Sequence, residues 1–130
     1  MLHYYHSLVN QNTLISSKKI QKCKASGDLV IENIFTPKEI KKMLQALTKI
    51  ANLAKNLNDS NSIFDLDPSH IPKNSRIRRI KNPFYNHPVF EKAARSPKLI
   101  SVLTSLLGPN VRMHRSKIKL KAPHDGVPVE

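Results

Sequence analysis

The residues best suited to bind a charged partner are four cations that recur at every second position: Arg115, Lys117, Lys119 and Lys121. Because side chains alternate between the two faces of a β-strand, a strand here would place all four cations on one face. Ile118 and Leu120 would lie on the opposite face. If the cationic face is buried, it needs anionic partners. If it is exposed, it is a solvated sheet edge that discourages aggregation. The spacing alone leaves both interpretations open.

The remaining polar residues do not form a recognisable catalytic motif. The iron site of many oxygenases needs two histidines and one carboxylate. We find neither H-x-D nor H-x-E, which could supply a histidine and a carboxylate together. His124 and Asp125 are adjacent, so they cannot both point inward from one strand, and the sequence HDGVP predicts a turn. Three glycines are too few to build a phosphate-binding loop.

Two further groups contain residue types that bind metals. Asp65, Asp67 and His70 lie in a segment rich in Asn, Asp, Ser and Pro, where both aspartates are expected to cap turns. The H-x-x-H pair at residues 3–6 has no acidic residue or cysteine nearby, which argues against a zinc site. We expect residues 1–15 to be a frayed N-terminus. The sequence therefore predicts no catalytic residue and no metal ligand.

The composition narrows the class of protein. A chain of 130 residues is one domain or part of one. Its net charge of +13 is typical of proteins that bind nucleic acid or an acidic partner, although no zinc-finger, basic-zipper or aromatic RNA-binding motif is present. The single Cys23 excludes an intramolecular disulfide and suits a reducing compartment. No apolar run is long enough to span a membrane and no signal peptide is recognisable, so we expect a cytoplasmic protein.

Capping residues and apolar spacing predict four helices, over residues 18–25, 37–57, 87–95 and 97–107. Ser16 or Ser17 can cap the first helix, and Gly27 can end it. The second helix begins with the capping box Thr36-Pro37-Lys38-Glu39, and we expect its apolar stripe to be core. Ser96 can cap the last helix, which Gly108 and Pro109 end.

Three segments are predicted to be extended. The β-branched and apolar run at 28–35 indicates a buried strand. Residues 76–80 indicate a short strand that Pro83 stops, and the segment from 111 to 121 indicates a long one. The polar segment 58–74 is predicted to be loop. These elements together predict an α+β fold.

Two stretches resemble the phytanoyl-CoA dioxygenase family of iron(II)- and 2-oxoglutarate-dependent oxygenases. They are GDLVIENIFTPKEI at 27–40 and SPKLISVLTSLLGPNVRMHRSKIKLKAP at 96–123. The resemblance extends over 16–130. It implies a helical N-terminal support and the first strands of an incomplete double-stranded β-helix, or jelly roll. In the family the next motif is an iron-binding W-H-x-D, so the resemblance implies the N-terminal portion of a domain whose C-terminal half is absent.

The resemblance also implies a function. The family hydroxylates an aliphatic carbon of a small-molecule substrate, using Fe(II) and 2-oxoglutarate, and this portion alone is expected to be inactive. The resemblance implies that the co-substrate is bound by Arg79, Arg115, Lys117 and Lys119. Lys119 stands at a position where the family has an Asn. The alternative is a small basic binding protein without catalysis, which acts on nucleic acid or on an acidic partner.

Overall fold

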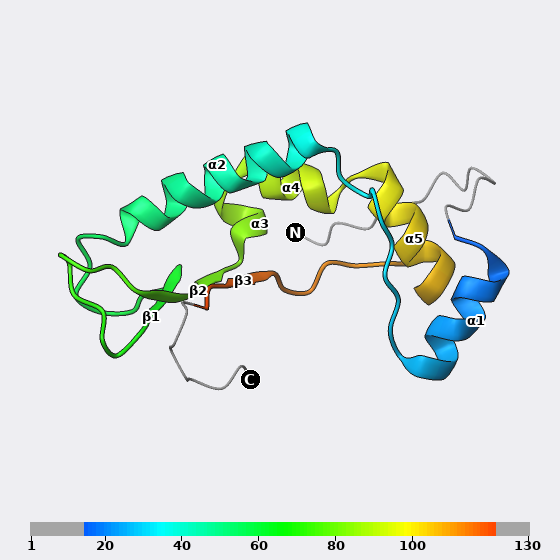
Figure 1. Cartoon of the computed structure of the whole chain (residues 1–130), viewed down its shortest axis with the longest axis horizontal. Helices are drawn as coiled ribbons and strands as arrows, with labels where there is room; N and C mark the ends of the chain where they lie inside the picture. The colour runs from blue at the N-terminus through cyan, green and yellow to red at the C-terminus, as the bar shows by residue number, and fades with distance from the viewer. Residues whose placement is uncertain (1–14, 122–130) are drawn as a thin grey trace.

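The computed structural model describes residues 15–121 (Figure 1). Its helices are α1 (Ser17–Ser26), α2 (Pro37–Leu53), α3 (Pro83–Asn86), α4 (Pro88–Ala94) and α5 (Pro97–Leu107). Its strands are β1 (Phe64–Leu66), β2 (Ile77–Lys81) and β3 (Lys117–Lys119). The predicted α+β class is confirmed. In the described range no helix has the length and apolar character that a bilayer crossing requires.

The three strands form one antiparallel sheet in the order β1-β2-β3. The chain leaves β2, passes through α3, α4 and α5, and returns to add β3 at the other side of β2. In Figure 1 the sheet lies below α2, while α1 and α5 lie together at the far end from β1. A jelly roll needs a second sheet facing the first. The described residues contain a single sheet, so the jelly roll stays a prediction.

The core lies between α2 and one face of the sheet. Its buried residues are Ile50, Ala54, Phe64 and Ile80, which come from α2, the turn that follows it, β1 and β2. Partly buried apolar side chains surround them: Leu47, Leu57, Ile63, Leu66, Ile77, Phe90, Ile118 and Leu120. α4 packs beside α2 and extends this layer. The cluster holds β3 in place because Ile118 and Leu120 face it.

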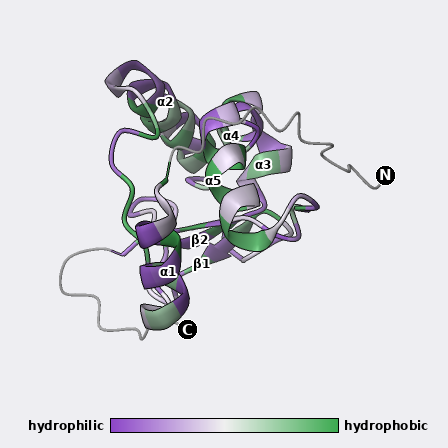
Figure 2. Ribbon diagram, turned by 90° about the vertical axis from the view of Figure 1, so that its right-hand side faces the viewer, coloured by the Kyte–Doolittle hydropathy of each residue, from purple (hydrophilic) through white to green (hydrophobic). Residues whose placement is uncertain are grey.

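Only part of the predicted core stripe on α2 is buried. Ala46 and Ile50 are buried, whereas Leu44 is 58% exposed. The sheet strands are three to five residues long, which is short beside this 17-residue helix, and the helix also packs against α4. α1 contributes no buried residue, and Figure 2 shows it largely in purple, the colour of hydrophilic residues.

The helix caps agree with the sequence. In the predicted capping box, the Thr36 hydroxyl accepts a hydrogen bond from the Glu39 N–H at 3.2 Å, and a Glu39 carboxylate oxygen accepts one from the Thr36 N–H at 2.8 Å. These Thr36 hydrogen bonds keep the pKa of Glu39 below its usual value. The Ser16 and Ser96 hydroxyls cap α1 and α5 by accepting hydrogen bonds from the N–H groups of Lys19 and Leu99, and Gly27 ends α1 with φ 79°.

Replacing Thr36 by alanine should lower the free energy of unfolding by about 1 kcal/mol, because the first turn of α2 loses a hydrogen-bond acceptor. Urea denaturation followed by circular dichroism measures the change. Thr48→Ala is the control on the same helix, since the Thr48 hydroxyl only bonds back to the Leu44 carbonyl. Equal losses in the two variants would contradict a specific role for the cap.

Two predicted extended segments differ from the structure. Residues 28–35 form no strand: Val30 is 79% exposed, and Asn33 adopts φ 59°, a left-handed conformation that interrupts an extended chain. The predicted strand over 111–121 is reduced to Lys117–Lys119, which pair in register with β2, and the Leu120 N–H donates one further hydrogen bond to the Arg78 carbonyl. An apolar or alternating sequence becomes a strand only where a partner strand lies beside it.

Two short elements were not predicted. β1 (Phe64–Leu66) lies inside the segment predicted as loop, and three residues are too few to show a period of two. α3 begins at Pro83, the residue expected only to stop a strand. Proline fits the first position of a helix because its missing N–H would have no partner there. The predicted strand at 76–80 and helix at 87–95 are confirmed within a residue as β2 and α4.

Candidate functional site

The pairing of the strands gathers charged residues on the sheet face that points away from α2. Phe64, Ile80 and Ile118 are direct partners across the three strands, and all three face the core. The neighbouring positions therefore face the other way. We call them the charged face: Asp65, Arg79, Lys81, Lys117 and Lys119.

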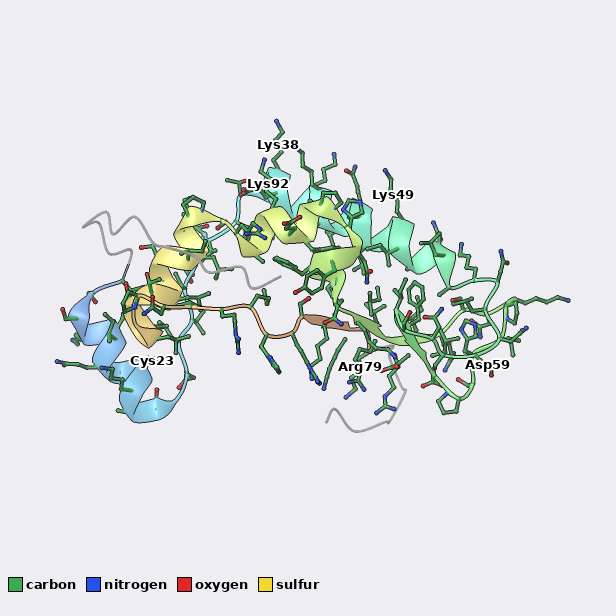
Figure 3. All side chains as sticks on the ribbon, turned by 180° about the vertical axis from the view of Figure 1, so that it is seen from behind. Cys23, Lys38, Lys49, Asp59, Arg79 and Lys92 are labelled. Atoms are coloured by element: carbon green, nitrogen blue, oxygen red, sulfur yellow. The ribbon has the colours of Figure 1, made fainter. Side chains whose placement is uncertain are left out.

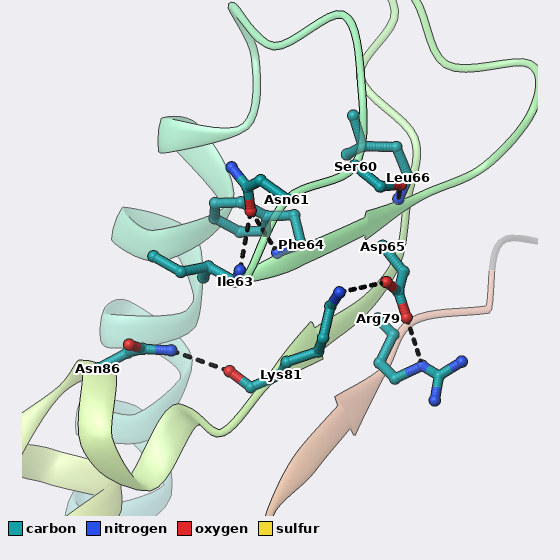
Figure 4. A network of polar contacts seen from close by, with 9 residues as sticks. All are labelled: Ser60, Asn61, Ile63, Phe64, Asp65, Leu66, Arg79, Lys81 and Asn86. Carbon is teal, nitrogen blue, oxygen red and sulfur yellow. Dashed lines mark hydrogen bonds and ion pairs between the residues drawn. The ribbon is translucent and has the colours of Figure 1, made fainter.

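One carboxylate holds two cations on the charged face. Oδ2 of Asp65 lies 2.9 Å from Nε of Arg79, and Oδ1 lies 2.7 Å from Nζ of Lys81 (Figure 4). All three side chains are partly exposed. The hydrogen bond from Lys81, and then the charges of Lys81 and Arg79, keep the pKa of Asp65 below its usual value, although partial burial opposes this shift. Asp65 is thus an ionised bridge between two residues of β2 that are two positions apart and lie on the same face.

The remaining pairs on the charged face join like charges. Arg79 lies directly opposite Lys119, and Lys81 directly opposite Lys117. Like charges at opposed positions destabilise a sheet. Asp65 is the one carboxylate in the described strands, so the face has a formal surplus of three positive charges. An arrangement that is locally unfavourable is expected where a function requires it. This face is suited to an anion.

The structure brings together three of the four residues predicted to bind the co-substrate. Arg79, Lys117 and Lys119 share the charged face, whereas Arg115 lies two residues before β3 and outside the paired strands. Arg115, Lys117 and Lys119 are exposed to solvent within residues 15–121. Whether they line a pocket therefore stays a prediction. Lys81 and Asp65 belong to the site and were not predicted, because strand register cannot be read from one segment.

Positive charge is not confined to this face. Figure 3 labels Lys38 and Lys49 on α2 and Lys92 on α4, on the side of the molecule opposite Arg79. A specific nucleic-acid binder usually concentrates its cations on one face or one helix. The distribution favours a local anion site on the sheet over one continuous basic surface.

His70 and Asp67 have structural roles. Nε2 of the buried His70 lies 2.8 Å from the Leu57 carbonyl oxygen, and Nδ1 accepts a hydrogen bond from the Arg76 N–H at 2.9 Å. The imidazole therefore links the turn after α2 to the start of β2. Asp67 accepts hydrogen bonds from the backbone and hydroxyl of Ser69, which confirms its predicted turn-capping role. Asp65 instead lies in β1, where it pairs with cations.

The described residues do not fit an iron ion. From residue 15 to residue 121, no three His, Cys, Asp or Glu side chains are grouped as metal ligands would be. Both ring nitrogens of His70 are bound to backbone groups, and Nδ1 of His87 accepts the Val89 N–H at the start of α4. The H-x-x-H pair at residues 3–6 and the pair His124 and Asp125 lie outside the described range.

The pH dependence of stability should reveal the Asp65 bridge. Because the folded-state pKa of Asp65 is below its usual 3.8, the ionised carboxylate stabilises the fold at neutral pH. That contribution should be lost as pH falls below about 4 and through the folded-state pKa. Thermal unfolding of the wild type and of Asp65→Asn, compared from neutral to acid pH, should show a difference in Tm that shrinks towards acid. A constant difference would contradict an ionised bridge.

Comparison with known proteins adds one relative. Over 104 residues the chain is 30% identical to a protein from Stutzerimonas stutzeri described as a probable alpha-ketoglutarate-dependent hypophosphite dioxygenase. The match covers 80% of this chain and 36% of the relative, so the chain spans about a third of that protein's length. No family model and no solved structure matches the chain. The similarity supports a relationship to the 2-oxoglutarate-dependent dioxygenases and does not single out the phytanoyl-CoA dioxygenase family.

Proposed function

We propose that this chain is the N-terminal part of an Fe(II)- and 2-oxoglutarate-dependent dioxygenase of the phytanoyl-CoA dioxygenase type, acting in the cytoplasm. The observation that carries the proposal is the similarity to an alpha-ketoglutarate-dependent dioxygenase over 80% of the chain. In such a domain α2 would support one face of a jelly roll, and the charged face would be turned inward. The family reaction would be hydroxylation of an aliphatic carbon in a small molecule.

The charged face suits the co-substrate. 2-Oxoglutarate is a dicarboxylate, and a guanidinium group with nearby ammonium groups is a strong partner for a carboxylate. Arg79, Lys117 and Lys119 would hold it, with Arg115 near the start of β3. Bound iron would supply the oxygen chemistry. Its ligands would have to come from outside residues 15–121, so we assign no iron ligand and no catalytic residue here.

The relative's name points to a second kind of substrate. It is described as acting on hypophosphite, which is a small inorganic oxyanion and has no carbon. The surplus of positive charge on the charged face would suit such an anion as well as 2-oxoglutarate. The proposed substrate is therefore a small molecule of unspecified kind, and the part of the proposal that can be tested is the binding of the co-substrate 2-oxoglutarate.

Binding of 2-oxoglutarate to the purified chain tests the proposal. In a nuclear magnetic resonance titration, backbone signals of β2 and β3 should shift while those of α1 stay unchanged. The Lys49→Ala variant is the control and should show the same shifts as the wild type, since Lys49 lies on the opposite side of the molecule (Figure 3). If 2-oxoglutarate moves no signal of β2 or β3 at millimolar concentration, the proposed co-substrate role is wrong.

We expect that the chain by itself does not consume 2-oxoglutarate, because residues 15–121 contain no group of three potential metal ligands. Succinate formation by the purified chain with Fe(II) and 2-oxoglutarate should equal that of an iron-only control. A rate clearly above the control would show that residues outside the described range complete an iron site.

The alternative, a basic binding protein without catalysis, is favoured by the solvent exposure of Arg115, Lys117 and Lys119. Phosphate contacts of nucleic acids use such cations and are strongly weakened by salt. The two functions differ in which anion is bound, so variants of the charged face can separate them.

A further inference from the structure

Arg79 has a defined orientation on the charged face. Its Nε donates to Oδ2 of Asp65 at 2.9 Å, from the directly opposite position of β1. Figure 4 shows Asp65 meeting the guanidinium on its Nε side, while the two terminal nitrogens point away from β1. A guanidinium has five N–H donors in a fixed plane, so one bond at Nε leaves the terminal pair available to a second partner.

The carboxylate that holds Arg79 is itself held in place. Oδ1 of Asp65 lies 2.7 Å from Nζ of Lys81, two positions further along β2. With an anchor at each oxygen, the Asp65 carboxylate cannot turn without breaking an ion pair. The Arg79 side chain is thereby fixed before any ligand arrives, which reduces the conformational entropy lost on binding.

We propose that Asp65 is a positioning residue for anion binding: it orients Arg79 so that the terminal nitrogens present a two-point site for a carboxylate or a similar oxyanion. The site lies on the charged face, beside Lys119, which is the direct partner of Arg79 on β3. Planar, two-point recognition is what distinguishes arginine from lysine as a carboxylate ligand. The inference deepens the proposed function and rests on it for the identity of the ligand as 2-oxoglutarate.

A purely electrostatic role for Asp65 predicts the opposite sign. If only charge mattered, removing a carboxylate beside the site would make anion binding tighter. If Asp65 positions Arg79, Asp65→Asn should weaken binding about tenfold, the scale of one charge-assisted hydrogen bond. Asp67→Asn is the matched control: it removes the same charge two residues away, where the carboxylate bonds to Ser69.

The test is a titration of the 130-residue chain with 2-oxoglutarate and, separately, with inorganic sulfate, followed by nuclear magnetic resonance. Weaker binding by Asp65→Asn, with Asp67→Asn unchanged or tighter, supports the inference. In the Arg79→Gln background, Asp65→Asn should have no further effect, a coupling that a merely structural role would not produce. Unchanged or tighter binding by Asp65→Asn overturns it.

Two further outcomes separate this inference from the proposed function. If sulfate binds as well as 2-oxoglutarate and Asp65→Asn weakens both, the positioning role stands and the co-substrate assignment fails. If the wild type binds neither anion, the inference is overturned.

If Asp65→Asn does not fold, the wild type provides a second measurement, the nuclear magnetic resonance signal of the Arg79 Nε–H. This proton should stay protected from exchange with water, while added anion shifts the signals of the terminal N–H groups. An exchanging Nε–H signal overturns the positioning role.

Discussion

Replacing Phe64 by alanine should lower the free energy of unfolding by about 3–5 kcal/mol, enough to unfold a marginally stable small domain. Phe64 is 2% exposed and is one of the two largest fully buried side chains of the described chain. It lies on β1 and packs against Ile50 and Ala54 from α2 and the following turn. The variant would leave a cavity in the middle of the small core. Urea denaturation followed by circular dichroism measures the loss.

Leu107→Ala is the control for this experiment. Leu107 is 71% exposed at the end of α5, so its truncation should change the free energy of unfolding by no more than about 0.5 kcal/mol. A loss below about 1 kcal/mol in Phe64→Ala would mean that β1 is not packed on α2. Since β1 also carries Asp65, that result would remove the basis of the charged face as well.

The parts of the fold that were predictable are those decided within a few residues. The Thr36–Glu39 capping box, the Ser96 cap and the Gly27 stop each depend on hydrogen bonds or backbone angles of a single turn, and all three are present. The segment 28–35 is different, because β-branched residues become a strand only beside a partner. Without a partner in the described chain, Val30 is left exposed.

The site was predictable to the extent that it follows from alternation within one strand. The i, i+2 spacing places Lys117 and Lys119 on one face, and the structure agrees. Arg79 was predicted to bind the co-substrate only because of the resemblance to an oxygenase family. Asp65 could not be found in this way, because it belongs to a three-residue strand and meets Arg79 only through the register of β1 on β2.

Replacing Lys117 by glutamate should raise the stability of the fold and weaken the binding of 2-oxoglutarate. The same variant distinguishes co-substrate binding from nucleic-acid binding. Lys117 lies directly opposite Lys81, so the variant turns a repulsive cross-strand pair into an attractive one. We expect a gain of about 0.5 kcal/mol in the free energy of unfolding, kept small by solvent exposure. Binding of 2-oxoglutarate should fall at least about tenfold, since the charge beside the carboxylate is reversed.

Lys49→Glu, on the opposite side of the molecule, is the control that distinguishes a site from net charge (Figure 3). Both variants change the net charge by the same amount. If the charged face binds 2-oxoglutarate, only Lys117→Glu should lose affinity. If the chain instead binds nucleic acid through its overall charge, both variants should weaken binding to DNA or RNA equally across sequences.

A salt titration of nucleic-acid binding completes the comparison. For a phosphate-binding surface, the logarithm of the binding constant falls linearly with the logarithm of salt concentration, and each lost phosphate contact lowers the slope by about one unit. We expect the wild type to bind DNA and RNA only weakly at physiological salt, because its cations are spread over both sides of the molecule. Micromolar binding there, with a slope that falls in Lys117→Glu, would make the charged face a phosphate-binding surface and overturn the co-substrate proposal. The charged face would then have the same cations and the same Asp65 bridge, with a polyanion in place of a dicarboxylate as its ligand.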